Sequence, residues 1–470
     1  MKKILAIAVI GILVLCGLEA GAVTETTSIK KSLTTSSDAY DMVIIAPEKF
    51  SSALQPLLDH KNTHGVKTFL KNTEDIYAQY EGRDQAEQVK YFIKDALENN
   101  TITYVLLVGG RKGQFPGWYV PVRYSNLDDG TNYSSFISDL YFADIYKGNT
   151  TEFEDWDSNG NGIFAEWNSN GKDVLDLTPD VIVGRLPCRN VREVKHIVEK
   201  IISYETATPG DWFNRMVCIG GDSFIGIGDP FPYEGEATCD VAASYMSGCN
   251  VVKLYTSTGA LTGSDDVLNE LNQGCGFVLT RGKGGTDKMR TFLPDGTEIV
   301  PIKNSVVRQL TNKDKYPVVI LGECIHGKFD VSILNILKLL KGDPNVYKEF
   351  RFNDCILECL AWQFVKQANS GGIAVITNTN LCYGDYGDKN HNDIPDDAER
   401  YGGFLATDIF KHYGQNGEHI LGQLYINTLK DYIQNFSVGT NKFDSKSIQE
   451  WTLFGDPSLQ IGGYQQEIDL

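Results

Sequence analysis

A cysteine follows directly on an apolar run of the chain. Residues 317–323 read PVVILGE, and Cys324 comes next. A cysteine at the end of a buried strand lies on the rim where α/β sheets keep their sites, so its thiolate could act as a nucleophile. A buried structural cysteine would show the same local pattern. The segment alone leaves both interpretations open.

A second apolar run ends in a lysine flanked by glycines. Residues 276–285 read GFVLTRGKGG, with Lys283 between Gly282 and Gly284. A histidine in this place would complete a thiol dyad, because its pKa of about 6.5 lets it donate and accept protons at neutral pH. A lysine, with a pKa of about 10.4, remains an ammonium. Catalysis at Cys324 therefore depends mostly on this one position.

These two runs belong to a longer alternation of strands and helices. The first strand is expected at 42–46, and apolar residues at helical spacing follow it from Phe50 to Leu58. This alternation indicates an α/β fold, with parallel sheets flanked by helices. Further strands are expected at 66–70, 104–108, 181–183, 216–219, 251–254, 277–280, 318–321 and 373–376.

The length of 470 residues exceeds that of one ordinary domain. We expect an N-terminal α/β subdomain over residues 40–208 and a catalytic-type α/β subdomain over residues 209–465. The second sheet could be separate from the first or continue it. Residues 23–39 are rich in Thr, Ser and Lys, so we expect a flexible lead there.

The first 22 residues have the pattern of an export signal. Lys2 and Lys3 precede an apolar stretch over 4–18, and the small residues AGA occupy 20–22. An uncleaved membrane anchor is the alternative, because the stretch is near the lower limit for spanning a bilayer. The sequence thus predicts a secreted or cell-surface protein, attached to a membrane only if this segment is retained.

Charge and composition exclude some classes of partner. The formal net charge is −18, and the composition, 42% hydrophobic and 22% charged, is that of a soluble globular protein. An acidic surface argues against a nucleic-acid partner, since phosphate neutralisation needs a basic patch. The glycine pairs at 109–110 and 220–221 lack the spacing of phosphate loops, so no nucleotide is expected.

Two acidic loops have the oxygen-rich spacing of calcium sites. Oxygen ligands at alternate residues can wrap a hard cation, and a final glutamate closes the shell. A solvated acidic turn is the other interpretation of each loop. The first loop has a glycine at its sixth position but an early glutamate, and its candidate ligands are Asp157, Asn159, Asn161 and Glu166. The second has Asp393 where glycine is usual, and its candidate ligands are Asp388, Asn390, Asn392, Asp396 and Glu399.

The chain resembles the gingipain family of cysteine peptidases, which are relatives of the caspases. The resemblance lies in the two strand ends at 276–285 and 317–324 and in four other segments. The resemblance runs from about Tyr40 to Leu459, and the order of the segments carries it. The four segments are YDMVIIAP at 40–47 with LDHK at 58–61, VLLVGG at 105–110, VGRLP at 183–187 and TLFGDPSL at 452–459.

This resemblance implies a caspase/gingipain-like fold of two subdomains and hydrolysis of protein or peptide substrates through a thiol. Carried over to this chain, Cys324 is the nucleophile, and the N–H groups of Gly284 and Cys324 form the oxyanion hole. Lys283 stands at the position of the family's histidine, which protonates the leaving amine.

Three hypotheses follow from Lys283. The chain could be a catalytically inactive peptidase fold that binds peptides or partner proteins at the cell surface. A histidine from another segment, His326, His391 or His412, could replace the missing one. Finally, Lys283 and Cys324 could form a dyad, as lysine replaces histidine in some serine hydrolases.

Overall fold

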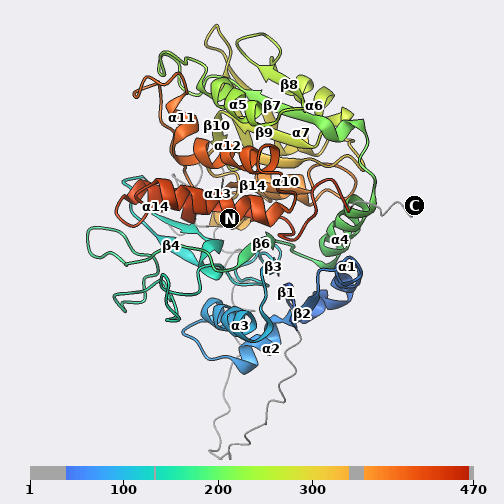
Figure 1. The fold of residues 1–470 in the computed structure, drawn as a ribbon, viewed down its shortest axis with the longest axis vertical. Coiled ribbons are helices and arrows are strands. Elements are labelled where there is room, and N and C mark those ends of the chain that lie inside the picture. Colours follow the sequence, from blue (N-terminus) through green and yellow to red (C-terminus); the bar gives the residue numbers. More distant parts are fainter. Residues whose placement is uncertain (1–38, 132–133, 338–353, 465–470) are drawn as a thin grey trace, which may run out of the picture. The chain divides into compact units, whose positions relative to one another are not determined.

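The computed structural model describes residues 39–131, 134–337 and 354–464. The predicted signal peptide, and the predicted lead up to residue 38, lie outside these ranges. Within them, a ten-stranded sheet has the order β2-β1-β3-β6-β15-β14-β13-β9-β7-β8. Helices flank this sheet, as the sequence predicts (Figure 1).

The strands of the large sheet are mostly short, apolar and buried, as expected for strands covered on both faces. Those predicted from the sequence begin within about two residues of their expected positions, whereas β15 was not predicted. The strands are β1 (Met42–Ala46), β2 (Thr68–Asn72), β3 (Tyr104–Val108), β6 (Ile182–Leu186), β7 (Arg215–Gly220), β8 (Asn250–Tyr255), β9 (Phe277–Arg281), β13 (Val318–Leu321), β14 (Ala374–Asn378) and β15 (Trp451–Phe454).

The sheet consists of two parallel blocks that run in opposite directions. β15 pairs in parallel with β6 and antiparallel with β14, whereas the other neighbouring strands pair in parallel. The second block therefore continues the first sheet. The carboxyl ends of β9, β13 and β14 share one edge, and those of β1, β3 and β6 point the opposite way.

The helices connect successive strands and pack on the sheet. α5, α12 and α13 lie side by side across it, with α5 against β7 and β9 and α13 against β6 (Figure 1). No helix within the described residues is both long and apolar enough to cross a membrane. The helices are α1 (Ser51–Thr63), α2 (Thr73–Gln79), α3 (Gln85–Asn100), α4 (Val191–Thr206), α5 (Glu234–Tyr245), α6 (Ser264–Gln273), α7 (Asn304–Val307), α10 (Leu360–Val365), α11 (Asp396–Glu399), α12 (Tyr401–Gly414), α13 (Leu421–Asn435) and α14 (Lys442–Gln449).

Two smaller sheets accompany the large sheet in the described part of the chain. A three-stranded antiparallel sheet follows β9 directly and consists of β10 (Lys283–Gly285), β11 (Lys288–Phe292) and β12 (Glu298–Lys303). A two-stranded sheet consists of β4 (Tyr124–Asn126) and β5 (Ser135–Ile137). Neither was predicted, and the first contains Lys283.

The predicted boundary between residues 208 and 209 falls in the connection between α4 and β7. The strands of the large sheet that precede it belong to one parallel block, and β7, β8, β9, β13 and β14 form the other. β15 is the exception, because the end of the chain returns to the first block. All described residues belong to one compact unit, Ala39–Leu470, so the two-subdomain division stays a prediction.

A buried ion cluster holds this returning segment in place. Lys61 Nζ on α1 lies 2.8 Å from Glu205 Oε1 on α4 and 2.8 Å from Asp456 Oδ2, which follows β15, and all three side chains are fully buried. Burial alone would lower the pKa of Lys61, but the carboxylates of Asp456 and Glu205 raise it above its ordinary value. The lysine is therefore charged, and its charge depends on both partners.

Replacing Asp456 with asparagine is expected to destabilise the protein by roughly 3–5 kcal/mol, because the change leaves part of a buried ion cluster uncompensated. Glu98→Gln is the control variant, since it removes an exposed ion pair with Lys94 that contributes about 0.5 kcal/mol or less. Thermal unfolding of both variants measures the loss of stability. Equal melting temperatures of the Asp456 and Glu98 variants would contradict this role of the cluster.

Candidate active site

Three strand ends meet at the edge where Cys324 lies. The register places Thr280 of β9, Leu321 of β13 and Thr377 of β14 at one level. The loops that follow these strands therefore share the carboxyl edge of the sheet, where α/β proteins bind ligands. They enclose a cavity of about 90 Å³, which is lined by Lys283, Gly284, Cys324 and Cys382 among others.

Gly284 and Cys324 touch through their backbones. A Cβ atom on residue 284 would overlap the carbonyl oxygen of Cys324 and lie 2.7 Å from its nitrogen. Glycine is the residue type that leaves room for this approach. The structure thus brings together the two residues whose N–H groups are predicted to form the oxyanion hole.

The turn after Cys324 is held in an unusual conformation. Ile325 has φ +63°, a region that β-branched residues rarely adopt. Its N–H donates to the carbonyl of Asn380 at 2.7 Å, and the N–H of Gly327 donates to the carbonyl of Asn378 at 2.8 Å. These bonds fasten the loop after β13 to the end of β14 and the residues that follow it.

The thiol of Cys324 has a second thiol as its neighbour. Cys382 Sγ lies 3.4 Å from Cys324 Sγ, and both are free cysteines that are partly exposed. A hydrogen bond from the Cys382 thiol lowers the pKa of Cys324 to about 7, although burial opposes the shift. Lys446 and His326 add positive charge in the same direction. This environment favours the thiolate form of Cys324 more than that of an ordinary cysteine.

Cys382 is the member of this site that sequence reasoning missed. It follows the predicted strand at 373–376, but Cys188, Cys218 and Cys275 also lie beside apolar runs, so the pattern does not single it out. Its proximity to Cys324 depends on β14 lying next to β13, which the sequence does not reveal. The same hydrogen bond that lowers the pKa of Cys324 raises that of Cys382 well above its usual value.

Lys283 opens β10 at the rim of the cavity and is half-buried. Its ammonium lies 4.9 Å from the ring centroid of Phe224, another residue that lines the cavity. This geometry is a cation–π contact. Lys283 is therefore part of the same pocket as Cys324, with an aromatic ring as its described partner.

His326, the histidine nearest to Cys324 in sequence, is fully buried beneath the site. Its Nε2 lies 3.1 Å from the carbonyl oxygen of Lys288, and its Nδ1 lies 3.4 Å from Glu323 Oε2. Glu323 also accepts a hydrogen bond from Thr280 at 2.7 Å. Both ring nitrogens thus face groups that tie the loops together.

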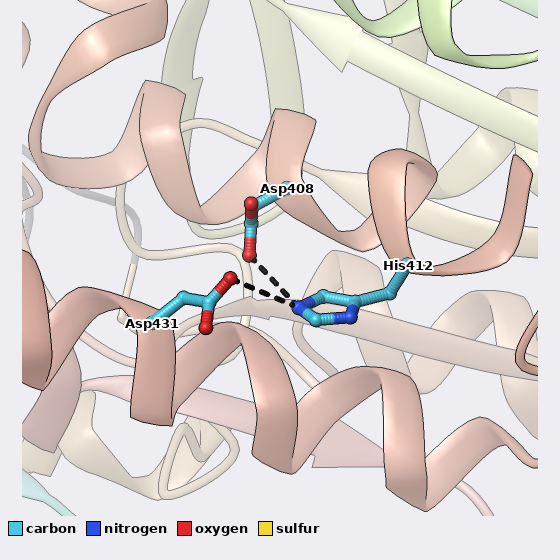
Figure 2. A group of neighbouring side chains, drawn as sticks. All are labelled: Asp408, His412 and Asp431. Carbon is cyan, nitrogen blue, oxygen red and sulfur yellow. Dashed lines mark ion pairs between the residues drawn. The ribbon is translucent and has the colours of Figure 1, made fainter. Parts of the chain in front are cut away.

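The two other candidate histidines have different surroundings. His391 lies exposed in the acidic loop at 388–399. His412 lies on α12, with Nε2 3.2 Å from Asp408 Oδ2 and 3.4 Å from Asp431 Oδ2 (Figure 2). Burial lowers the pKa of His412, but hydrogen bonding and charge from Asp408, with Glu418 and Asp431, raise it above its ordinary value.

All seven histidines of the chain belong to the described residues. Within the described residues, none of these histidines forms a hydrogen bond with Cys324. The sulfur of Cys324 bonds instead with the thiol and the carbonyl oxygen of Cys382. The hypothesis of a replacement histidine gains no support from these contacts.

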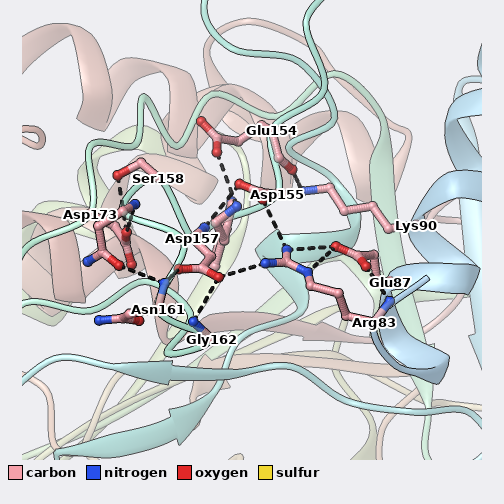
Figure 3. Close-up of polar contacts among 12 residues, drawn as sticks. Arg83, Glu87, Lys90, Glu154, Asp155, Asp157, Ser158, Asn161, Gly162 and Asp173 are labelled. Atoms are coloured by element: carbon pink, nitrogen blue, oxygen red, sulfur yellow. Dashed lines mark hydrogen bonds and ion pairs between the residues drawn. The ribbon is translucent and has the colours of Figure 1, made fainter.

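The first acidic loop folds around Asp157. Its carboxylate accepts the N–H groups of Asn161 and Gly162, each at 3.0 Å (Figure 3). The amide groups of Asn159 and Asn161 donate to Glu166 at 3.2 and 2.6 Å. Arg83 also pairs with Asp157 at 2.6 Å, so this loop already has a cationic partner.

The second acidic loop repeats this pattern. Asp388 accepts the N–H groups of Asn392 and Asp393, each at 3.0 Å. The amides of Asn390 and Asn392 donate to Glu399 at 2.9 and 2.7 Å. Asp396 instead accepts the N–H of Lys389 at 3.1 Å. Four of the five predicted ligands therefore converge on one another.

The fold and the site together define a class of protein: an α/β protein with a thiol pocket at the carboxyl edge of its sheet, beside a glycine backbone. A sequence profile of peptidase family C25 matches residues 35–462. The chain belongs to this family, which confirms the predicted gingipain relationship.

Relatives of known identity agree with this assignment. The chain is 21% identical to gingipain R2 of Porphyromonas gingivalis (strain W83) over 430 residues, which cover 89% of this chain and 46% of that protein. It is 22% identical to gingipain R1 of P. gingivalis over 430 residues, or 89% of this chain and 34% of that protein. The chain thus spans less than half the length of these relatives.

The crystal structure of the arginine-specific cysteine proteinase gingipain R (RgpB) is similar to the fold described above. The TM-score is 0.61 at 18% sequence identity, and the match covers 93% of this chain and 80% of that one. This likeness confirms the predicted gingipain-like fold.

Alkylation of Cys324 by iodoacetamide is expected to accelerate as the pH rises through about 7, because the thiolate is the reactive form. Cys382→Ala removes the hydrogen-bond donor and should move the midpoint of this profile to higher pH. Mass-spectrometric peptide mapping measures the rate at each pH. Cys275 is the internal control, since burial raises its pKa to about 12. An unchanged midpoint in the variant would contradict the role given to Cys382.

Proposed function

We propose that this chain is an exported cysteine endopeptidase that hydrolyses peptide bonds through Cys324. The observation that carries the proposal is the contact of Cys324 with the backbone of Gly284 at the cavity. Membership of peptidase family C25 makes a protein or peptide the natural substrate. The pattern of the first 22 residues supports export to the cell exterior.

The site provides for the first half of the reaction. The Cys324 thiolate attacks the carbonyl carbon of the substrate, and the resulting oxyanion accepts hydrogen bonds from the N–H groups of Gly284 and Cys324. A thiolate at neutral pH needs a positive or hydrogen-bonding environment. Here the hydrogen bond from Cys382 and the charge of Lys446 supply it.

Protonation of the leaving amine is the half of the reaction for which this site is less well equipped. The thiol of Cys382 is a poor acid, because its pKa is raised well above the usual value. The ammonium of Lys283 is one of several groups at the cavity that could donate a proton, and the others include Glu234, whose pKa burial raises to about 7. A lysine is a weaker acid than an imidazolium, and loss of a well-matched acid or base typically costs about 10²- to 10⁴-fold in rate. We therefore propose slow turnover.

The contact of Lys283 with Phe224 favours a second candidate function. In this alternative the chain is a catalytically inactive member of the family that binds peptides or partner proteins at the cell surface. A cation–π contact gives the lysine a role in shaping the pocket without any proton transfer. The pocket would then bind a peptide whose bond it does not cleave.

A peptidyl probe with a thiol-reactive group is expected to label the wild-type protein at Cys324 and to leave Cys324→Ala unlabelled. Lys283→His should raise turnover of peptide substrates by up to roughly 10²- to 10⁴-fold, because an imidazole can protonate the leaving amine. Labelling is measured by peptide mapping, and turnover by release of a fluorescent group.

Lys288→His is the matched control for the lysine substitution, because Lys288 lies on the neighbouring strand β11 and does not line the cavity in the described structure. Turnover by the wild type that disappears in Cys324→Ala would rule out the inactive alternative. Absence of labelling by a broad set of probes would overturn the peptidase proposal.

We also propose that Ca²⁺ binds the acidic loops. The carboxylates of Asp388 and Glu399 and the amides of Asn390 and Asn392 form one cluster of the donor type that calcium prefers. The loop at 157–166 has the same arrangement, but Arg83 competes there for Asp157. We therefore assign the stronger site to residues 388–399.

Calcium is expected to raise the melting temperature relative to a chelator, because an ion that binds only the folded state stabilises it by mass action. Glu399→Gln should abolish most of the shift, and Glu166→Gln, the matched change in the other loop, should abolish less. Differential scanning fluorimetry at several calcium concentrations measures both. An identical melting temperature with calcium and with chelator would remove both loops from the proposal.

A further inference from the structure

The two thiols at the candidate site are held together by the backbone around them. Cys324 follows β13 and Cys382 follows β14, and their sulfurs lie 3.4 Å apart although 58 residues separate them in sequence. The amide of Asn378 also donates to the carbonyl of Glu323 at 3.2 Å. With the two backbone bonds described above, this bond fixes the loops on both sides of the thiols.

The pair is accessible to small molecules. Both cysteines line the cavity of about 90 Å³ and are partly exposed. A small oxidant can therefore reach the sulfur of Cys324. Redox-sensitive cysteines combine exposure, thiolate character and a neighbouring thiol that resolves the oxidised form.

We propose that Cys324 and Cys382 form a reversible disulfide in response to a hydroperoxide, which makes Cys382 the resolving cysteine of this site. The Cys324 thiolate attacks the terminal peroxide oxygen and breaks the O–O bond, which gives a sulfenic acid and releases hydroxide from hydrogen peroxide or an alkoxide from an organic hydroperoxide. Cys382 then attacks that sulfur as its thiol loses the proton, and this proton leaves with the hydroxyl group of the sulfenic acid as water while the S–S bond forms. A dithiol reductant returns both thiols by exchange and becomes a disulfide itself.

The disulfide has two consequences. It removes the thiolate, so the sulfur of Cys324 no longer reacts with electrophiles; its effect on peptide hydrolysis rests on the proposed function. It also protects Cys324 from further oxidation to sulfinic acid, which cannot ordinarily be reversed. An exported protein meets oxidising conditions, and such protection would preserve the nucleophile there.

A second thiol pair in the chain provides a matched comparison. Cys218 Sγ lies 4.0 Å from the carbonyl oxygen of Cys239, and both residues are fully buried. Burial raises the pKa of Cys239 well above its usual value, and hydrogen bonding to Cys218 adds to this. Two fully buried thiols should resist peroxide, because the oxidant cannot reach them.

The test uses the full chain, reduced with dithiothreitol, desalted and treated with graded hydrogen peroxide. Non-reducing peptide mapping should show a peptide that links Cys324 to Cys382, with a mass loss of two hydrogens, and dithiothreitol should restore iodoacetamide labelling of Cys324. In Cys382→Ser the link cannot form, Cys324 should proceed to sulfinic acid, and labelling should not return.

Two outcomes would overturn the proposal. One is irreversible oxidation of Cys324 in the wild type without a link to Cys382. The other is a link between Cys218 and Cys239 at the same peroxide concentration, which would indicate general unfolding and not a property of the site. The mapping needs no peptidase activity, so a linked peptide in a protein that never hydrolyses substrate would support this inference while removing the proposed function.

Discussion

The register of three neighbouring parallel strands is the constraint on which the candidate site depends. Because Thr280, Leu321 and Thr377 lie at one level, the short loops after β9, β13 and β14 must share one edge of the sheet. Gly284 and Cys324 then come into backbone contact, which leaves no room for a Cβ on residue 284. A slip of one residue in any of these strands would turn its side chains to the other face and separate these groups.

Much of this arrangement could be predicted from the sequence. Apolar β-branched runs indicate strands, and the residues that follow each run are expected at the edge of the sheet. The order of the strands in the sheet could not be predicted, because it brings together residues that are distant along the chain. Cys382 and the return of β15 to the first block both depend on that order. The small sheet containing Lys283 was missed because a glycine-rich segment favours a loop.

In the acidic loops, local spacing indicated that the candidate ligands converge. The contact of Arg83 with Asp157 could not be inferred, because the two residues are 74 positions apart in sequence.

Under the proposed function, in which Lys283 stands where the family has a histidine, the two halves of thiol catalysis are affected unequally. The influences that lower the pKa of Cys324 begin with the hydrogen bond from Cys382, and Lys283 is not among the main ones. The Nε2 of His326 lies 3.1 Å from the carbonyl oxygen of Lys288, and its Nδ1 lies 3.4 Å from Glu323 Oε2. In the proposed reaction, nucleophilic attack is thus supported by the surrounding fold, whereas no histidine forms a hydrogen bond with Cys324 to deliver the proton within the described residues. On this proposal the site is better equipped to capture an electrophile than to release a product.

The conformation of Ile325 bears on whether this pocket is only a structural remnant. A β-branched residue at φ +63° costs of order 1–3 kcal/mol and persists only where its surroundings impose it. Here the bonds to Asn378 and Asn380 impose it. The strained turn directs the chain away immediately after Cys324, so that the sulfur remains at the cavity beside Gly284. The hydrogen bonds that hold this strained residue are therefore the same ones that fasten the loop of Cys324 to the residues after β14, where Cys382 lies.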